Sequence, residues 1–412
     1  MSLAWVSLGA LVVAMTVSCF SALNVGVLAI VLAWVVGFYF GDMPLNEVLS
    51  GFPVNLFLTL VGVTLLFTQA QLNGTLDRVA KLAVGVCRGN AGVIPIMFFV
   101  LGATISTLGP GNIATAAMLA PMAMAIALRL GIPLFLMAIM VGHGVQSAAL
   151  SPFGPTGIIV NGIMEKIGLP GHEAYTYWAN IFGHAAVAFT GYLLFGGLKL
   201  FRSNDRLALA QEEPQLTLGR VHVATLLAVL GVIAFVIATG ANIGMVAAVA
   251  AVILAAFRFA DHEQALKRMP WSPIVMVTGV TVLIALLEKT GGMDLFTTFL
   301  SSFVTPSTLS AAMAFVTGLI SIYSSTAGVV LPAFLPTVPG LIEEVGGGDP
   351  LKVATAMNVG AHIVDTSPLS TIGAICIAAI PATEDPRATY VKLLAWGLSM
   401  ALVGALGAFI LL

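Results

Sequence analysis

Charged residues are scarce in this chain. Lys, Arg, Asp and Glu make up 8% of its 412 residues, whereas 59% are hydrophobic and the mean hydropathy is +1.06. Soluble domains carry about 25% charged residues, so the composition excludes a soluble globular protein and indicates a membrane protein with many spans. The formal net charge of −2 says little about partners other than lipid, and we expect no nucleic-acid partner.

Cysteine is also rare. Cys19, Cys87 and Cys376 are far apart, and each lies in or beside an apolar run. We interpret them as small core residues rather than as a disulfide or a metal site.

Motifs of nucleotide-driven or catalytic proteins are missing. The sequence has no Gly-Lys-Ser/Thr of a nucleotide-binding loop and no His-Glu-x-x-His of a metalloprotease. Gly346-Gly347-Gly348-Asp349 resembles the Gly-x-Gly-Asp of intramembrane aspartyl proteases, but Pro350 follows it and no partner Asp lies at matching depth, so we interpret it as a turn. We therefore expect no enzyme and no cofactor, apart from a possible Na⁺.

Long apolar runs predict an all-α membrane protein. Runs long enough to cross the hydrocarbon fall at about 3–20, 23–40, 53–69, 133–165, 175–200, 221–238, 240–258, 273–288, 351–381 and 388–412. The first run lacks a basic flank and continues into a second span, which favours a retained helix over a cleaved signal. The runs at 133–165 and 351–381 are too long for one straight span, and each contains a Ser-Pro break. Two further runs, 91–130 and 297–345, contain polar breaks and are expected to be re-entrant hairpins.

The two halves of the chain are similar in sequence. Asn24-Val25-Gly26 matches Asn242-Ile243-Gly244 at an offset of 218, and Gly62-Val63-Thr64 matches Gly279-Val280-Thr281 at 217. We predict repeats at 1–200 and 221–412, joined by a cytoplasmic linker at 201–220. Each half then has five crossings, one of them a broken helix, plus one hairpin. An odd number of crossings makes the repeat inverted.

Basic residues test this topology independently. Thirteen of the 16 Lys and Arg residues fall on one predicted side, and only Lys166, Lys289 and Lys352 fall on the other. The excess marks the cytoplasmic side. We therefore expect a bacterial inner-membrane protein with both termini facing the periplasm. Residues 73–89, and more weakly 293–304, predict amphipathic interfacial helices that suspend a moving hairpin.

Four small, polar, Gly- or Pro-broken patches lie at matched places in the halves. Backbone at membrane depth leaves the helix only where protein or a water-filled cavity satisfies it, so the patches predict one central site made by both halves. Half-helices beginning near 113, 156, 327 and 371 would direct their N–H groups at an anion. The expected substrate-binding residues are Gly111, Asn112, Thr115, Ser151, Pro152, Thr156, Ser324, Ser325, Thr326, Ser367, Pro368 and Thr371. The alternative for any single Ser or Thr is a hydrogen bond to its own helix.

A coupling ion is expected beside the substrate. Asp365 borders the second break, where it either binds a cation or proton or caps the next half-helix. Asn112 and Ser325 are the other expected coupling-ion residues. His143 and His362 are possible proton carriers, with a structural neutral histidine as the alternative for each. His184 is interpreted as packing.

The sequence resembles the ion-transporter superfamily, and most of all the bacterial MatC-type malonate and dicarboxylate carriers. The resemblance is strongest over 20–165, through Gly51-Phe-Pro-Val-Asn-Leu-Phe-Leu, Val61-Gly-Val-Thr-Leu-Leu-Phe, Asn73-Gly-Thr-Leu and Gly111-Asn-Ile-Ala-Thr-Ala-Ala-Met-Leu-Ala-Pro. The sequence is also similar to the divalent-anion/sodium symporters, whose Ser-Asn-Thr tips are partly kept at 111–113 and 324–326. The resemblance implies a homodimer, an elevator-type transport domain and Na⁺ sites at the tips and facing loops.

These observations predict a secondary active transporter of a small C3–C4 dicarboxylate, coupled to Na⁺ or H⁺. A cation/proton antiporter of the same superfamily is the alternative, in which Asp365 titrates and no organic anion binds. A channel is a weaker alternative, because it requires a continuous pore with charge or carbonyl rings.

Overall fold

The computed structural model describes residues 2–21, 23–86, 90–201 and 217–412. All regular secondary structure in these residues is helical. Seven helical segments are long and apolar enough to cross a membrane. They are Leu3–Phe20, Val54–Leu72, Gly111–Arg129, Arg220–Thr239, Trp271–Thr290, Thr326–Val345 and Arg387–Leu411. The predicted all-α, multi-pass class is confirmed. Cys87 and most of the predicted 201–220 linker lie outside the described residues.

In the described part of the first half, helices follow one another with short connections. They are α1 (Leu3–Phe20), α2 (Val25–Val35) with the π-helical turn η1 (Val36–Phe40), α3 (Leu45–Leu49), α4 (Val54–Leu72), α5 (Thr75–Val86), α6 (Val93–Leu108), α7 (Gly111–Arg129), α8 (Leu134–Ser147), α9 (Pro155–Lys166) and α10 (Glu173–Leu194). A short helix, α11 (Gly197–Leu200), precedes the linker.

The second half presents the same order of elements. They are α12 (Arg220–Thr239), α13 (Ile243–Ala256), α14 (His262–Arg268), α15 (Trp271–Thr290), α16 (Gly292–Ser301), α17 (Leu309–Ser321), the run η2 (Thr326–Val330), α18 (Leu331–Phe334), η3 (Leu335–Thr337) and α19 (Val338–Val345), then α20 (Pro350–Ile363), α21 (Thr371–Ala378) and α22 (Arg387–Leu411). The apolar run expected from 297 is divided, because α16 occupies its start and the second helix–break–helix segment begins at Leu309.

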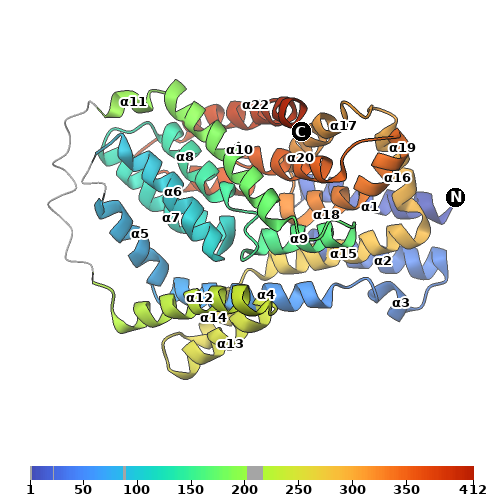
Figure 1. Cartoon of the computed structure of the whole chain (residues 1–412), viewed down its shortest axis with the longest axis horizontal. Helices are drawn as coiled ribbons and strands as arrows, with labels where there is room; N and C mark the ends of the chain where they lie inside the picture. Colours follow the sequence, from blue (N-terminus) through green and yellow to red (C-terminus); the bar gives the residue numbers. More distant parts are fainter. Residues whose placement is uncertain (1, 22, 87–89, 202–216) are drawn as a thin grey trace.

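Close contacts between the halves are made by a helix from each half. α2 packs on α15, and α13 packs on α4 (Figure 1). Glycines make both crossings possible: a Cβ on Gly279 would overlap the backbone of Gly26, and a Cβ on Gly62 would overlap the backbone of Gly244. Asn24 and Asn242 reinforce the crossings, since each caps its own helix and hydrogen-bonds to the partner helix at Ser272 or Thr59.

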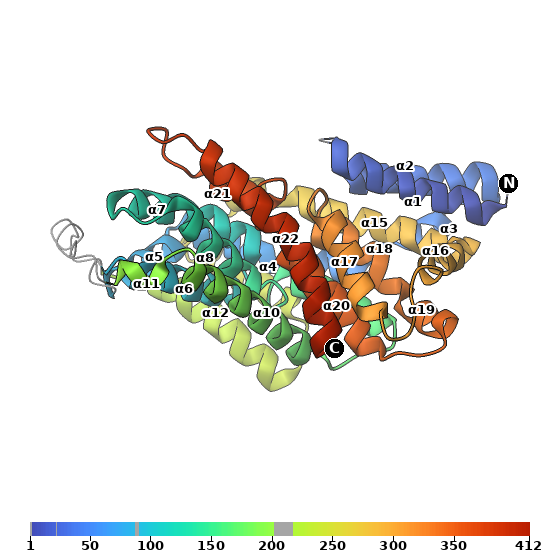
Figure 2. The ribbon, with the colours of Figure 1, turned by 90° about the horizontal axis from the view of Figure 1, so that it is seen from above.

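A second group of helices, which includes α6, α7, α8, α10, α17, α20 and α22, lies above this layer in Figure 1, whereas α12 lies beside α13. α6 packs on α7 and α8, and α17 packs on α20 and α22. In Figure 2, α22 crosses the molecule diagonally, and it contacts α17 and α20 of its own half and α8 of the other. α10 likewise contacts both α8 and α20. The broken helices α8–α9 and α20–α21 are therefore held between the two halves.

Helices in this group stop at four short breaks. We name residues 109–113 the first tip, 322–327 the second tip, 148–154 the first unwound loop and 364–370 the second unwound loop. At the first tip Gly109 and Gly111 have φ of +131° and +80°, values that favour glycine. In the second unwound loop the Asp365 carbonyl accepts hydrogen bonds from Ser370 Oγ and, at 3.2 Å, from Gly373 N. Local side chains thus replace some of the helical hydrogen bonds that the breaks remove.

Candidate functional site

Three of the four breaks line one cavity of about 40 Å³. Both tips, the second unwound loop and the first turns of α9 and α21 supply its walls. The lining residues are Asn112, Ile113, Thr156, Ser324, Ser325, Thr326, Ala327, His362, Asp365, Thr371 and Ile372. Residues up to 260 positions apart in the sequence therefore meet at one place. A cavity of this size has room for a few waters or a small cation.

Asp365 is the carboxylate of this cavity and is 8% exposed. Thr326 Oγ1 lies 2.9 Å from both carboxylate oxygens, and Gln146 Nε2 donates to Oδ2 at 2.5 Å. Ser321 Oγ lies 2.9 Å from Thr326 Oγ1, so it can donate to the threonine while the threonine donates to Asp365. Neutral donors hold this carboxylate, and no Lys or Arg is among the described residues that line the cavity.

A hydrogen-bonded chain connects the two halves through Asp365. Asn112 Nδ2 at the first tip donates to Gln146 Oε1 at 2.6 Å, and the amide of Gln146 donates onward to Asp365. Asn112 Oδ1 accepts from Ile113 N at 3.0 Å, which fixes the orientation of its amide. The first tip, α8, the second unwound loop and the second tip are therefore joined through side chains.

A larger cavity of about 240 Å³ adjoins the first and shares Ser324, Ser325 and Thr371 with it. Its wall is rich in hydroxyl and amide groups from α1, α2, α15 and the second tip, and none of its described lining residues carries a charge. The complete lining is Ser18, Ser21, Leu23, Asn24, Val25, Ser272, Met276, Tyr323, Ser324, Ser325, Leu369, Ser370 and Thr371. The shared Ser324 also contacts Ser18 of α1, with 2.8 Å between their hydroxyl oxygens.

Some of the predicted substrate residues do not line these cavities. Gly111, Pro152 and Pro368 shape the backbone at the breaks, and Thr115 Oγ1 donates to the Gly111 carbonyl of its own helix at 2.7 Å. Ser151 Oγ donates to the Thr107 carbonyl at 2.7 Å, which attaches the first unwound loop to α6. Ser367 Oγ accepts from Leu369 N at 3.4 Å. The structure brings Asn112, Thr156, Ser324, Ser325, Thr326, Asp365 and Thr371 together, and it places the others around them.

The histidines are arranged differently from the sequence interpretation. His184 is not merely a packing residue, because its Nδ1 lies 3.0 Å from Nδ1 of His143. His143 Nε2 accepts a hydrogen bond from Trp396 Nε1 at 2.9 Å, and His143 does not line the cavity. His362 does line it, and its Nδ1 donates to the Asn358 carbonyl at 2.7 Å. The Asp365 N–H donates to the His362 carbonyl at 3.1 Å, but no hydrogen bond joins the two side chains in the part of the chain that the structure describes.

Two polar residues of the network escape the sequence analysis. Gln146 bridges Asn112 and Asp365, and Asn180 Nδ2 donates to the Gln146 and Ser147 carbonyls at 2.8 and 2.9 Å. A signal for Gln146 exists: His143-x-x-Gln146 and His362-x-x-Asp365 stand 219 residues apart. Within the described residues, no group of three or more His, Cys, Asp and Glu is arranged to hold a metal ion.

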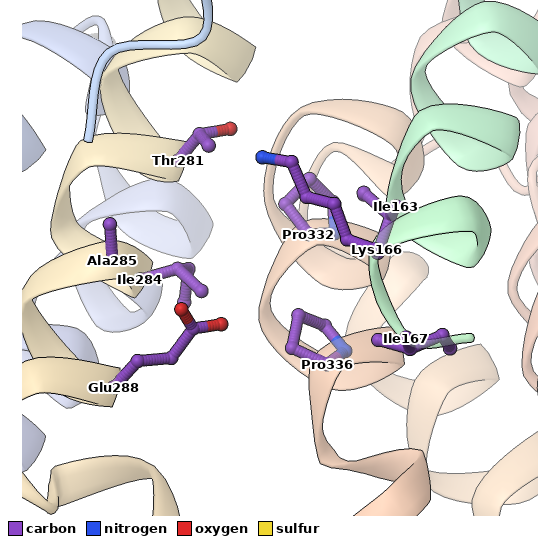
Figure 3. A pocket seen from close by; sticks show the side chains of 9 residues that line it. All are labelled: Ile163, Lys166, Ile167, Thr281, Ile284, Ala285, Glu288, Pro332 and Pro336. Atoms are coloured by element: carbon purple, nitrogen blue, oxygen red, sulfur yellow. The ribbon is translucent and has the colours of Figure 1, made fainter. Parts of the chain in front are cut away.

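A third cavity, a crevice of about 370 Å³, separates α15 from α9 and the proline-rich run after the second tip. In Figure 3, Thr281, Ala285 and Glu288 on α15 face Lys166 of α9 across it, and Pro332 and Pro336 stand on the Lys166 side. The crevice thus lies between a helix of the lower layer and elements that hold the breaks. It contains one basic and one acidic side chain.

Comparisons with known proteins agree with this architecture. Residues 1–149 match the family model described as the dicarboxylate carrier protein MatC N-terminus. This part of the chain is MatC-like. The match confirms the resemblance to MatC-type carriers expected from the sequence. No curated protein matches the chain.

Two solved structures share the fold. The YdaH transporter of Alcanivorax borkumensis has a TM-score of 0.52 at 13% identity, over 91% of this chain and 88% of that one. MtrF of Neisseria gonorrhoeae, described with a class of antimetabolite efflux pumps, has a TM-score of 0.59 at 14% identity, over 99% and 93%. At such low identities the likeness shows the fold alone. The chain is therefore a multi-pass membrane protein with a fold found in transporters.

Proposed function

We propose that this protein is a secondary active transporter that moves a small dicarboxylate, of three or four carbons, together with a cation. The observation that carries the proposal is the meeting of both tips and the second unwound loop at one polar cavity, where a hydrogen-bonded chain runs from Asn112 through Gln146 to Asp365. The match of residues 1–149 to the MatC carrier family supports the substrate class.

The smaller of the two adjoining cavities binds the cation, and the larger one binds the substrate. The 40 Å³ cavity is too small for an organic dianion, whereas the hydroxyl-rich 240 Å³ cavity has the room. We place the carboxylates of the substrate against Ser324, Ser325 and Thr371, which belong to both cavities. Hydroxyl groups and helix N-terminal N–H groups bind carboxylates without a buried cation.

Electrostatics require the cation. Asp365 is buried without a basic residue among its described neighbours, and a dianion in the next cavity adds two negative charges. Burying like charges together is costly unless they are neutralised. A proton or Na⁺ bound at the Asp365 cavity therefore favours substrate binding, and substrate binding favours the cation. This reciprocal dependence is the physical basis of symport.

The transport movement follows from the repeat. We propose that the halves form an inverted repeat, with five crossings and one re-entrant hairpin each, and that both termini face the periplasm of a bacterial inner membrane. The layer containing α4 and α15 is the scaffold of a homodimer, and the group with the tips and unwound loops moves against it as an elevator. The amphipathic helices α5 and α16 connect the two parts.

Uptake into proteoliposomes tests the proposal. Labelled malonate, malate and succinate are offered with and without Na⁺ and with and without a pH gradient. We expect concentrative uptake of at least one of them, and its loss in Asn112→Ala and Ser325→Ala at unchanged protein content. Thr16→Ala, a hydroxyl removed from α1 outside both cavities, is the matched control. Full uptake in both site variants would remove the proposed site, and no uptake of any dicarboxylate by the native protein would remove the substrate class.

A further inference from the structure

Both tips pack on helices of the lower layer, and they do so at the same end of that layer. A Cβ on Gly109 of the first tip would lie 2.2 Å from the ring of Phe67, close to the end of α4. A Cβ on Gly328, directly after the second tip, would lie 2.5 Å from the sulfur of Met276, close to the start of α15. The tips therefore lie against the last turns of α4 and the first turns of α15.

These two helix ends are cytoplasmic in the orientation proposed above. Lys81 follows α4, Lys267 and Arg268 precede α15, and an excess of basic residues marks the cytoplasmic side. The 240 Å³ cavity lies at the same end, because the end of α1 and the starts of α2 and α15 line it. The second tip is attached there through the contact between Ser324 and Ser18 of α1. The substrate site thus lies at the cytoplasmic end of the scaffold, as in an inward-facing transporter.

The difference between the two halves gives the size of the outward movement. At the repeat offset of 217, Met276 of α15 corresponds to Thr59 of α4, whereas the first tip contacts α4 at Phe67. The two tips therefore contact equivalent helices eight residues apart, which is about 12 Å at 1.5 Å per residue. In an inverted repeat the opposite state forms when the halves exchange their conformations. This exchange moves both tips outward along α4 and α15 by about 12 Å.

The crevice between α9 and α15 lies along this movement. In Figure 3 the ammonium group of Lys166 is at the Thr281 end of the crevice, and the carboxylate of Glu288 is at the other end. Glu288 lies seven residues further outward on α15 than Thr281, or about 10 Å. Neither Lys166 nor Glu288 is in an ion pair with another described residue. The neighbouring Lys289 contacts α3 instead, where its Nζ donates to the Glu47 carbonyl at 3.1 Å.

We propose that Lys166 and Glu288 form an ion pair in the outward-facing state and stabilise that state. An outward movement of about 12 Å carries Lys166, at the end of α9, from the level of Thr281 to that of Glu288. Both side chains are exposed, so the pair is weak and is screened by salt. The inference rests on the elevator movement proposed above, and it adds a contact that the inward-facing state lacks.

Distances between spin labels test the movement without a transport assay. Labels are attached to Lys166→Cys/Glu288→Cys and to Lys166→Cys/Thr281→Cys, after Cys19, Cys87 and Cys376 are replaced by Ser. We expect a second population in which the 166–288 distance is shorter and the 166–281 distance is longer. Glu47→Cys/Glu288→Cys, with both labels on the scaffold, is the control and should give one population. A single 166–288 distance in protein that still exchanges dicarboxylate would overturn the inference.

A double-mutant cycle in right-side-out vesicles tests the pair itself. External substrate binds the outward-facing state, so the KM rises as the population of that state falls. At low salt Glu288→Gln should raise the KM about twofold, and Lys166→Gln/Glu288→Gln should raise it no further than Lys166→Gln alone. Glu343→Gln, which removes an exposed carboxylate outside the crevice, is the control and should leave the KM unchanged.

The alternative for these two charges is simple attraction or repulsion of the incoming dianion. Glu288→Gln then removes a repelling charge and lowers the KM, and the double variant returns close to the native value. Either of these results would overturn the ion pair but leave the dicarboxylate carrier standing. If the native protein takes up no dicarboxylate, the carrier proposal fails, and the label distances still decide whether Lys166 moves toward Glu288.

Discussion

The two halves of the molecule share a backbone plan but not a chemistry. Their helix crossings are near copies, with Gly26 on Gly279 and Gly244 on Gly62. Their central polar positions differ, because His143-x-x-Gln146 in the first half corresponds to His362-x-x-Asp365 in the second, and Gln146 donates to Asp365. Both crossings use glycine because any side chain at these positions would overlap the backbone of the facing helix. The polar positions differ because one carboxylate can be neutralised by one cation, whereas two facing carboxylates would repel.

The tips differ in the same way. α7 continues from the first tip as one regular helix, whereas the second tip leads into a π-turn, a short α-helix and a 3₁₀ turn before α19. Pro332, Pro336 and Pro339 account for this irregularity, because a proline inside a helix removes one hydrogen bond and collides with the preceding turn. The half that contains Asp365 is thus also the half with the more irregular backbone after its tip.

The largest expected effect comes from breaking the shared plan at its crossings. In Gly279→Ala the new methyl group would overlap the Gly26 backbone, and overpacking of this kind costs about 1–3 kcal/mol. Gly62→Ala should behave alike, because the equivalent crossing has the same contact. Gly231→Ala on α12, where nothing lies within 4 Å of the new Cβ, should be neutral or stabilising by up to about 1 kcal/mol.

Thermal unfolding and the yield of monodisperse protein in detergent measure this difference. We expect a lower midpoint and a lower yield for both crossing variants, and unchanged values for Gly231→Ala. Equal midpoints for all three variants would show that the glycine crossings do not support the fold.

The next effect separates the two polar positions. Asp365→Asn keeps acceptor and donor groups next to Gln146 and Thr326 but removes the charge that a cation neutralises. Exchange of internal for external dicarboxylate should continue, and the accumulation ratio should fall to about 1. Gln146→Asn, which shortens the neutral partner without changing its charge, is the control and should slow uptake while leaving accumulation above 1. Unchanged accumulation in Asp365→Asn would clear this carboxylate of the coupling role.

The sequence predicts much of this arrangement because the relevant signals are local. Apolar runs predict the helices, and Gly109-Pro110-Gly111 and the Ser-Pro pairs predict the breaks. An Asp within an apolar run is rare, so Asp365 is recognised as a functional candidate. Partners across the fold are harder to predict. Gln146 and Asn180 act through residues on other helices, and the pairing of His143 with His184 depends on how α8 meets α10. The spacing of His143 and His184 in the sequence contains no information about the contact between their side chains.

The smallest expected effect concerns the crevice between α15 and α9. Lys166 is the basic residue among the described residues that line it, and both Lys166 and Glu288 are exposed, so their charges act through solvent. In Lys166→Gln the local attraction for an incoming dianion weakens, and we expect a two- to threefold higher KM for external substrate at low salt with unchanged kcat. At about 0.5 M salt screening shortens the range of the charge, so the difference should vanish. Lys352→Gln, a lysine expected on the same side but outside the crevice, is the control. Equal KM values for both variants at low salt would show that the substrate does not pass Lys166.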